Sequence, residues 1–446
     1  FRALRSEKIP SNSKPDRRKC RSTSAKVAAA GTIGSSMIPK PVFGYHNSDN
    51  DKLKIGLIGC GGRGTGAVLN ATNADSNTSV TALADAFPDR IASCAKSLSK
   101  QLPDRFNVDK DHMFDGVDCY KNLVASDVDV VILATPPYFR PMQLKAAVDA
   151  GKHVFCEKPV GVDVPGVRSV MESCKKAAAN GQSVVSGLCW RYDLGVNDMI
   201  SRIKNGEIGE VKSIQENYLT GTLWHRGEGT TNPETKEFRK WSPMEYQLRN
   251  WLYFNWLSGD HIAEQHIHSI DKALWLMDDI PPVSCYATGG RLVRTNEKWG
   301  NVYDHFSTVF EWEDSDVKAH TYCRQMAGCF NETEDHIVGT KGTAKILKGQ
   351  IINEDGKFSH KKRNPSMYDV EHQHLFRSIR EGKPINNGTY MSYSTLMALI
   401  GRDAAYTGKK IMWEDFMKSE KRLGPDDIYN AENYVPDKVA RPGSEW

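Results

Sequence analysis

The sequence predicts an α/β protein: an N-terminal Rossmann domain with a doubly wound parallel sheet, followed by a C-terminal α+β domain with a large, mostly antiparallel open sheet. Three observations support this prediction. A glycine-rich turn follows the first strongly apolar run, strand-like and helix-like segments then alternate to about residue 190, and strand-like segments separated by turns follow. Alternation is typical of parallel sheets with crossover helices, and strands joined directly by turns indicate antiparallel pairing.

Length and charge limit the classes to which this chain can belong. Its 446 residues exceed one ordinary core, so we expect a cofactor-binding domain at 51–188 and a substrate-binding domain at 189–446, with residues of about 390–415 packing back on the first. The 59 Lys and Arg against 55 Asp and Glu leave a net charge of +4 and no basic stripe for nucleic acid. No long uncharged apolar run exists, so we predict no membrane span.

Residues 1–50 differ in composition from the rest of the chain. Arg17 and Arg18 precede a stretch of small, weakly apolar residues, "SAKVAAAGTIG". This segment resembles a twin-arginine export signal. The alternative is a disordered basic tail. We expect a periplasmic or extracytoplasmic protein if the signal is functional and a cytoplasmic one otherwise.

The glycine-rich turn has the spacing of a dinucleotide-binding site. Residues 53–58 form an apolar, strand-like run, and Gly59, Gly61 and Gly64 follow in a G-x-G-x-x-G pattern. The first glycine permits a tight turn, the second lets the backbone approach a pyrophosphate, and the third lets the helix pack on the strand. The next strand ends at Asp85, where a carboxylate accepts hydrogen bonds from ribose hydroxyls and repels a 2′-phosphate. The pattern therefore favours NAD, although Asp85 could also be an ordinary turn residue.

Two further strands end in polar or turn-forming residues. "DVDVVILATPP" ends at Thr135 and Pro136, and "KHVFCEKP" ends at Glu157 and Lys158. Ligands of doubly wound sheets lie beyond the carboxyl ends of the strands. Lys158 is therefore expected to face a ligand.

Three short motifs together resemble the Gfo/Idh/MocA family of nicotinamide-dependent oxidoreductases: GCGGRG, ATPP and EKP, in this order and spacing, within a resemblance that covers about residues 52–415. The resemblance implies that Lys158 lies beside the nicotinamide and the substrate hydroxyl, while Glu157 and Pro159 shape the loop and touch the cofactor. It also implies a mixed open sheet that covers the nicotinamide site. Such sheets often form subunit interfaces, so we expect a homo-oligomer.

The family pattern of acidic and histidine residues maps onto "GDHIAEQHIHSIDK". It places Glu264 at an aspartate position, His268 at a histidine and Asp271 at a further acid. Oxidation of a secondary alcohol needs a base for the hydroxyl proton. We assign His268 as the base and Lys158 as the group that polarises the oxygen or shares the proton transfer. Glu264 either touches the substrate or orients His268.

An aromatic insertion lies between the predicted strands of the second half. It contains Trp224, Trp241, Trp251 and Trp256, with His225 among them. Flat rings next to polar side chains suit the binding of a sugar ring. Core packing beneath a long loop is an equally good interpretation.

These arguments define two sets of candidate residues. The substrate set is Lys158, Tyr192, Trp224, His225, Trp256 and His268. The cofactor set is Gly59, Gly61, Gly62, Arg63, Gly64, Asp85, Thr135, Pro136, Glu157, Lys158, Trp190 and Arg191.

The predicted function is hydride transfer between NAD and a hydroxyl of a sugar or polyol, without a metal. One alternative is an NAD-using glycoside hydrolase that oxidises its sugar transiently. An alternative of another class is a metal-dependent hydrolase, because His261, Glu264 and His268 would share one face of a continuous helix. Their spacing is not H-E-x-x-H, so this signal is weak.

Overall fold

The computed structural model describes residues 51–446 except for positions 233, 314, 362–363 and 445. The paired arginines of the predicted export signal lie outside the described residues, so export stays a prediction. Among the helices of the described part, none combines the length and the apolar character that a membrane crossing requires.

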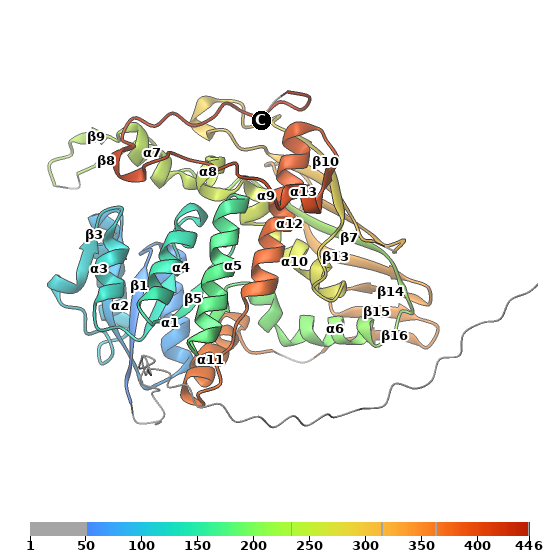
Figure 1. Ribbon diagram of the computed structural model, residues 1–446, viewed down its shortest axis with the longest axis horizontal. Helices are drawn as coiled ribbons and strands as arrows, with labels where there is room; N and C mark the ends of the chain where they lie inside the picture. Colours follow the sequence, from blue (N-terminus) through green and yellow to red (C-terminus); the bar gives the residue numbers. More distant parts are fainter. Residues whose placement is uncertain (1–50, 233, 314, 362–363, 445) are drawn as a thin grey trace, which may run out of the picture. The chain divides into compact units, whose positions relative to one another are not determined.

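The first half of the described chain is a six-stranded parallel sheet with the strand order β3–β2–β1–β4–β5–β6 (Figure 1). The direction of winding reverses between β1 and β4, and ligands of such sheets bind at the carboxyl ends of the strands beside the reversal. The strands are β1 (Leu53–Ile58), β2 (Thr78–Asp85), β3 (Met113–Asp115), β4 (Val130–Leu133), β5 (His153–Cys156) and β6 (Val184–Ser186). The helices that follow the first five strands are α1 (Gly62–Ala74), α2 (Pro88–Gln101), α3 (Cys119–Ala125), α4 (Arg140–Asp149) and α5 (Val164–Ala179).

The central strand β4 shows why these segments are apolar throughout. Val130 and Ile132 belong to the buried cluster on one face of the sheet, and Val131 and Leu133 belong to the cluster on the other. All four side chains are fully buried. Since both faces are covered, every residue of such a strand is apolar and the two-residue alternation of a half-exposed strand is absent.

The second half forms a nine-stranded mixed sheet, as expected, in which only β7 and β12 pair in parallel and the other neighbours are antiparallel. Its strands are β7 (Val211–Thr220), β10 (Ser284–Gly290), β11 (His305–Glu311), β12 (Lys318–Gln325), β13 (Glu332–Gly339), β14 (Gly342–Lys345), β15 (Gln350–Asn353), β16 (Gly356–Ser359) and β17 (Ile411–Met412). The segment "HIVGTKGTAKIL" reads as a single strand in the sequence, but it forms the β13–β14 hairpin. At its turn, the amides of Thr340 and Lys341 donate to the carbonyls of Glu210 and Ile208 instead of continuing the ladder.

Between β7 and β10 lie the insertion and the helices that carry the acidic and histidine residues. They are β8 (Gly229–Thr231), β9 (Phe238–Lys240), α7 (Pro243–Arg249), α8 (Asn255–Ser258), α9 (His261–Glu264) and α10 (Ile267–Leu276). The remaining long helices are α6 (Leu194–Lys204), α11 (Met367–Arg380) and α12 (Gly388–Thr407).

Helix α12 joins the two halves of the described chain. It packs against α5 on one side and against α10 and β10 on another, and Figure 1 shows it between α5 and the second sheet. Leu396 and Leu399 of α12 belong to one buried cluster with Val167 of α5 and Phe310 of β11. Just before the helix, the Asn387 side chain accepts hydrogen bonds from the amide of Ser186 and the hydroxyl of Tyr192 at 3.0 and 2.7 Å.

Candidate active site

The glycines of the turn after β1 divide into two groups by the space around them. Gly59 has φ +102°, and a Cβ there would lie 2.6 Å from the backbone of Ala134. A Cβ on Gly64 would lie 1.9 Å from the carbonyl oxygen of Gly59. At Gly61 and Gly62, by contrast, a Cβ would meet nothing within 4 Å. Gly59 and Gly64 therefore allow the close packing of strand and helix, and Gly61 and Gly62 leave open space for a ligand.

That open space is a cavity of about 310 Å³ at the reversal point of the first sheet. The predicted cofactor residues that line it are Gly59, Gly61, Gly62, Arg63, Asp85, Thr135 and Pro136. Asp85 accepts hydrogen bonds from the amides of Cys60 at 2.7 Å and Phe87 at 3.0 Å. Burial raises the pKa of Asp85, and these hydrogen bonds oppose the rise. A carboxylate accepts about four hydrogen bonds, so Asp85 keeps capacity for ribose hydroxyls, and the cavity fits NAD.

Arg63 connects this cavity to the Glu-Lys pair after β5. Its Nε donates to Glu157, and its Nη2 donates to Oε1 of Glu371 on α11 at 2.8 Å. The guanidinium also lies 4.7 Å from the ring centroid of Tyr368. Burial raises the pKa of Glu371 well above its ordinary value, the Glu157 charge adds to the rise, and Arg63 opposes it. Glu157 is buried, and its pairing with Arg63 compensates for the loss of solvent around its charge.

Lys158 crosses from the first sheet to α9. Its Nζ donates to the carbonyl oxygen of Glu264 and lies 3.0 Å from Oε1 of the same residue. Both side chains are mostly buried, with 14% and 16% exposed. The carboxylate of Glu264 thus pairs with Lys158, whereas the sequence left open whether it contacts the substrate or orients His268.

His268 lies in the first turn of α10, next to Trp190. The two ring centroids are 5.4 Å apart, and Nζ of Lys272 lies 3.5 Å from the centroid of the same indole. Lys272 donates to the carbonyl of His268 at 2.9 Å and pairs with Asp335 at 3.1 Å. Burial lowers the pKa of His268 well below its ordinary value, and the charges of Lys158, Lys272 and Arg63 lower it further. The imidazole is therefore neutral at pH 7 and able to accept a proton.

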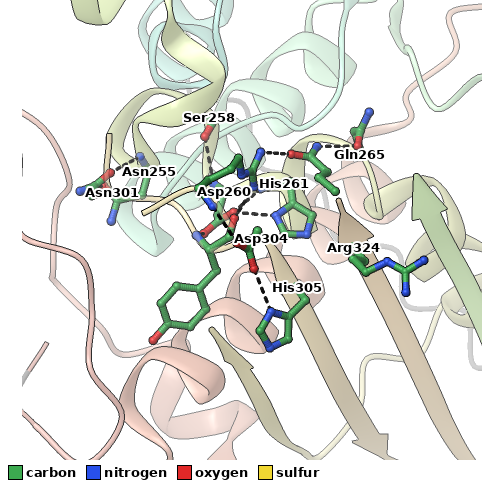
Figure 2. A network of polar contacts seen from close by, with 12 residues as sticks. Asn255, Ser258, Asp260, His261, Gln265, Asn301, Asp304, His305 and Arg324 are labelled. Atoms are coloured by element: carbon green, nitrogen blue, oxygen red, sulfur yellow. Dashed lines mark hydrogen bonds and ion pairs between the residues drawn. The ribbon is translucent and has the colours of Figure 1, made fainter. Parts of the chain in front are cut away.

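The continuous helix that the metal alternative needs is not formed. α9 ends at Glu264 and α10 begins at Ile267, so the expected common face is interrupted. Figure 2 shows the ring of His261 directed at Asp260, with Nδ1 and Oδ1 3.0 Å apart. Asp260 also accepts from the amide of Tyr303 at 2.8 Å, within the same buried network. Within the ranges that the structure describes, no three His, Cys, Asp or Glu side chains are grouped to hold a metal ion.

Several other predicted residues have structural partners. Arg191 pairs with Asp271 of α10 at 2.8 Å and with Asp279 in the turn after that helix at 2.7 Å, and it is not among the residues that line the cavity. The hydroxyl of the buried Tyr192 donates to Asn387. Trp256 is only 1% exposed and donates to Gln247, so the structure places it in the core, where its ring cannot stack on a sugar.

The insertion contacts the cofactor cavity, which sequence reasoning missed. Trp224, predicted as a sugar contact, lines the cavity together with Arg226, Leu248, Arg249 and Trp251. His225 instead points to the hydroxyl of Tyr246 at 3.0 Å, and burial lowers the pKa of His225. The insertion's aromatic and basic composition was visible in the sequence, but nothing in it indicated which cavity these residues line.

Comparison with known proteins matches both halves of the chain to family models. Residues 53–184 match an oxidoreductase family with an NAD-binding Rossmann fold, and residues 196–345 match the GFO/IDH/MocA C-terminal domain.

Individual relatives are more distant. The 2,7-anhydro-N-acetylneuraminate hydratase of Escherichia coli (strain K12) is 28% identical over 221 residues, which are 49% of this chain and 51% of that protein. Inositol 2-dehydrogenase 3 of Saccharopolyspora erythraea is 26% identical over 298 residues, 66% of this chain and 73% of that one. The match thus spans only about half the length of the first relative and about three quarters of the second.

A solved structure shares the fold. Scyllo-inositol dehydrogenase from Lactobacillus casei, with bound NAD(H) and scyllo-inositol, has a TM-score of 0.59 at 20% sequence identity and covers 81% of this chain and 99% of its own.

Substitutions at Gly61 and Gly64 should separate cofactor binding from folding. A Cβ at Gly61 meets nothing within 4 Å, so Gly61→Val projects into the open space, and NAD binding should be lost while the melting temperature changes little. Gly64→Ala drives a methyl group into the Gly59 carbonyl and should lower the melting temperature. Calorimetric NAD titration and thermal unfolding of both variants test this. Tight NAD binding by Gly61→Val would place the phosphates elsewhere.

The low pKa of His268 predicts where activity falls on acidification. A base with a lowered pKa stays unprotonated as the pH drops through the ordinary histidine range, so the acidic limb of kcat/KM for alcohol oxidation should lie below about pH 6.5. A pH–rate profile measures it, with His112→Gln, a change directly before the edge strand β3, as the control. An acidic limb above that pH would show that another group is the base.

Proposed function

The chain belongs to the Gfo/Idh/MocA family of oxidoreductases with an NAD-binding Rossmann fold, and we propose that it transfers hydride between NAD and a secondary hydroxyl of a sugar or polyol. One observation carries the proposal. Lys158, at the carboxyl end of β5, and Arg63, which lines the dinucleotide cavity, both lie close enough to His268 at the start of α10 for their charges to lower its pKa.

The two side chains have complementary roles in this proposal. The Lys158 ammonium donates a hydrogen bond to the substrate oxygen, and Glu264 balances its charge while the site is empty of substrate. The neutral imidazole of His268 accepts the hydroxyl proton, and Trp190 and Lys272 fix its position. Bound NAD supplies the hydride acceptor.

The substrate class rests on relatives and on the polar character of the residues around Lys158. One relative is named inositol 2-dehydrogenase, and the structural neighbour holds scyllo-inositol together with NAD(H). Inositol and scyllo-inositol are polyols. A secondary hydroxyl of such a molecule can accept a hydrogen bond from a lysine and give its proton to a histidine.

A second candidate is a reaction in which the hydride is returned before product release, as in transient oxidation of a glycoside. The covering of the cofactor cavity by Trp224, Arg226 and Arg249 favours it, since a covered cofactor exchanges slowly. The relative named as a hydratase supports a net reaction other than oxidation. Net formation of NADH with free sugars would support dehydrogenation, and aglycone release without net NADH would support the second candidate.

Lys158→Met should slow hydride transfer by about a hundredfold or more, because it deletes the charge and the donors but keeps the chain length. His268→Gln should have a similar effect, and NAD should still bind to both variants. Stopped-flow absorbance at the NADH band with a panel of sugars and polyols measures the step. Lys145→Met on the exposed face of α4 is the control. Full activity of Lys158→Met together with loss of activity in a chelator would support the metal-dependent alternative.

We also propose that the chain self-associates through the outer face of the second sheet. Strand register places Tyr286, Tyr322, Val338 and Ile352 on this face, and all four side chains are exposed. A row of apolar side chains along one open face suits a subunit interface. Sedimentation should show an oligomer that Val338→Glu weakens. A monomer at micromolar concentration would contradict this.

A further inference from the structure

We propose that the insertion, defined as residues 221–232 and 234–258, is part of the cofactor site and keeps NAD bound between turnovers. The inference rests on the proposed function only in that NAD is the ligand. It assigns cofactor contacts to a segment that lies outside the first sheet and its connections.

The insertion forms a cover over one side of the dinucleotide cavity. Trp224, Arg226 and Trp251 line the same cavity as Gly61 and Asp85. Figure 1 shows the elements of the insertion, β8, β9, α7 and α8, above the upper end of the first sheet and its helices. Gly61 and Asp85 mark where the pyrophosphate and the adenosine ribose bind, so the cover lies over the adenosine half of the dinucleotide.

An ion pair attaches the cover to helix α2 of the first domain. Arg249 at the end of α7 makes two hydrogen bonds to Asp89 of α2, at 3.0 and 2.7 Å. Glu245 braces the same guanidinium at 2.8 Å, and the ring of Phe87 lies 3.9 Å from it. The pKa of Asp89 is lowered, mainly by the hydrogen bond from Arg249. A bidentate arginine–carboxylate pair fixes both position and orientation.

A set of hydrogen bonds holds the loop that carries Trp224 and Arg226 in place. The hydroxyl of Tyr253 lies within hydrogen-bond distance of the carbonyl oxygens of Leu223 and Trp224, at 3.0 and 2.8 Å, and its single proton is shared between them. The side chain of Asn250 accepts from the amide of Arg226 at 2.8 Å. Tyr253 and Asn250 are buried, so the loop is attached to the core of the insertion.

The charges along the cavity fit the anionic part of the dinucleotide. Arg63 and Arg249 are committed to carboxylates, but Arg90 and Arg226 make no side-chain hydrogen bond or ion pair within the described ranges. The guanidinium of Arg226 lies only over the ring of Trp224, at 4.2 Å. Both guanidiniums line the cavity, Arg90 close to Asp85 and Arg226 from the cover, so they lie beside the adenosine half of the dinucleotide, next to its negatively charged phosphates.

A cofactor bound in this way leaves only when contacts of the cover break. Dissociation should therefore be slow, and each turnover should return the hydride on the protein, either to the same sugar or to a second carbonyl compound. In that exchange the bound NADH is oxidised to NAD⁺ as the carbonyl carbon takes the hydride and its oxygen takes a proton.

The test measures release of NADH from the purified full-length chain without any sugar. Bound NADH is chased with excess NAD⁺, and its fluorescence is followed at low and high salt. We expect Arg226→Ala to speed release by about tenfold and to reduce the salt dependence, because it removes a phosphate partner. Asp89→Asn should speed release by about threefold. It weakens the Arg249–Asp89 ion pair, and the effect is modest because the carboxylate is partly exposed.

Two matched variants control for general effects of charge and ion-pair removal. Lys240→Ala removes an exposed cation from the same insertion, away from the cavity, and Glu420→Gln breaks the ion pair between Glu420 and Arg168 of α5. Both should release NADH at the wild-type rate. Complete release from the wild type within the mixing time, or equal rates in Arg226→Ala and the wild type, would overturn the proposal. Slow release without hydride transfer to any sugar would overturn the proposed function alone.

Discussion

The close approach of Gly64 to the carbonyl of Gly59 is the constraint on which the rest of the site depends. It brings the first turn of α1 directly onto the end of β1, and no side chain other than hydrogen fits there. Arg63 immediately precedes this contact, so the packing of the helix also sets where its guanidinium lies. From there Arg63 reaches Glu157 at the end of β5 and Glu371 on α11, and Lys158 follows Glu157 in sequence. A steric fit between two glycines therefore positions the proposed catalytic lysine.

The charged side chains near the site form ion pairs, and these pairs favour the neutral form of His268. Removing one partner of a buried ion pair costs about 3–5 kcal/mol, because the other charge is left without compensation. Arg63, Lys158 and Lys272 each have a carboxylate partner within 3.1 Å or less. Among the described residues His268 has no acidic partner, and it lies near all three cations, so its neutral form is favoured. The arrangement places a neutral imidazole among three cations that are each paired with a carboxylate.

The insertion changes the character of an otherwise ordinary dinucleotide site. In a doubly wound sheet the cofactor cavity opens to solvent at the carboxyl ends of the strands. Here residues more than a hundred positions after the glycine turn contribute part of the cavity wall. The same aromatic residues that would suit a sugar are divided between two tasks: Trp224 and Trp251 line the cavity, and Trp256 packs in the core. Composition cannot distinguish these tasks, since an indole ring serves both equally well.

The sequence by itself determined the parts of this protein that depend on local rules. Glycine spacing, continuous apolar strands and the EKP motif predicted the parallel sheet, the dinucleotide site and the position of Lys158, because turn geometry and burial on both faces leave direct marks on neighbouring residues. Only the tertiary structure decided the contacts between distant segments. The pairing of Lys158 with Glu264, the commitment of Arg191 to Asp271, the break between α9 and α10 and the cover over the cavity all join residues far apart in sequence or depend on such packing. The sequence around a charged or aromatic residue does not identify its distant partner, because many residues could form the same ion pair or ring contact. Only the packing of the folded chain determines which of them does.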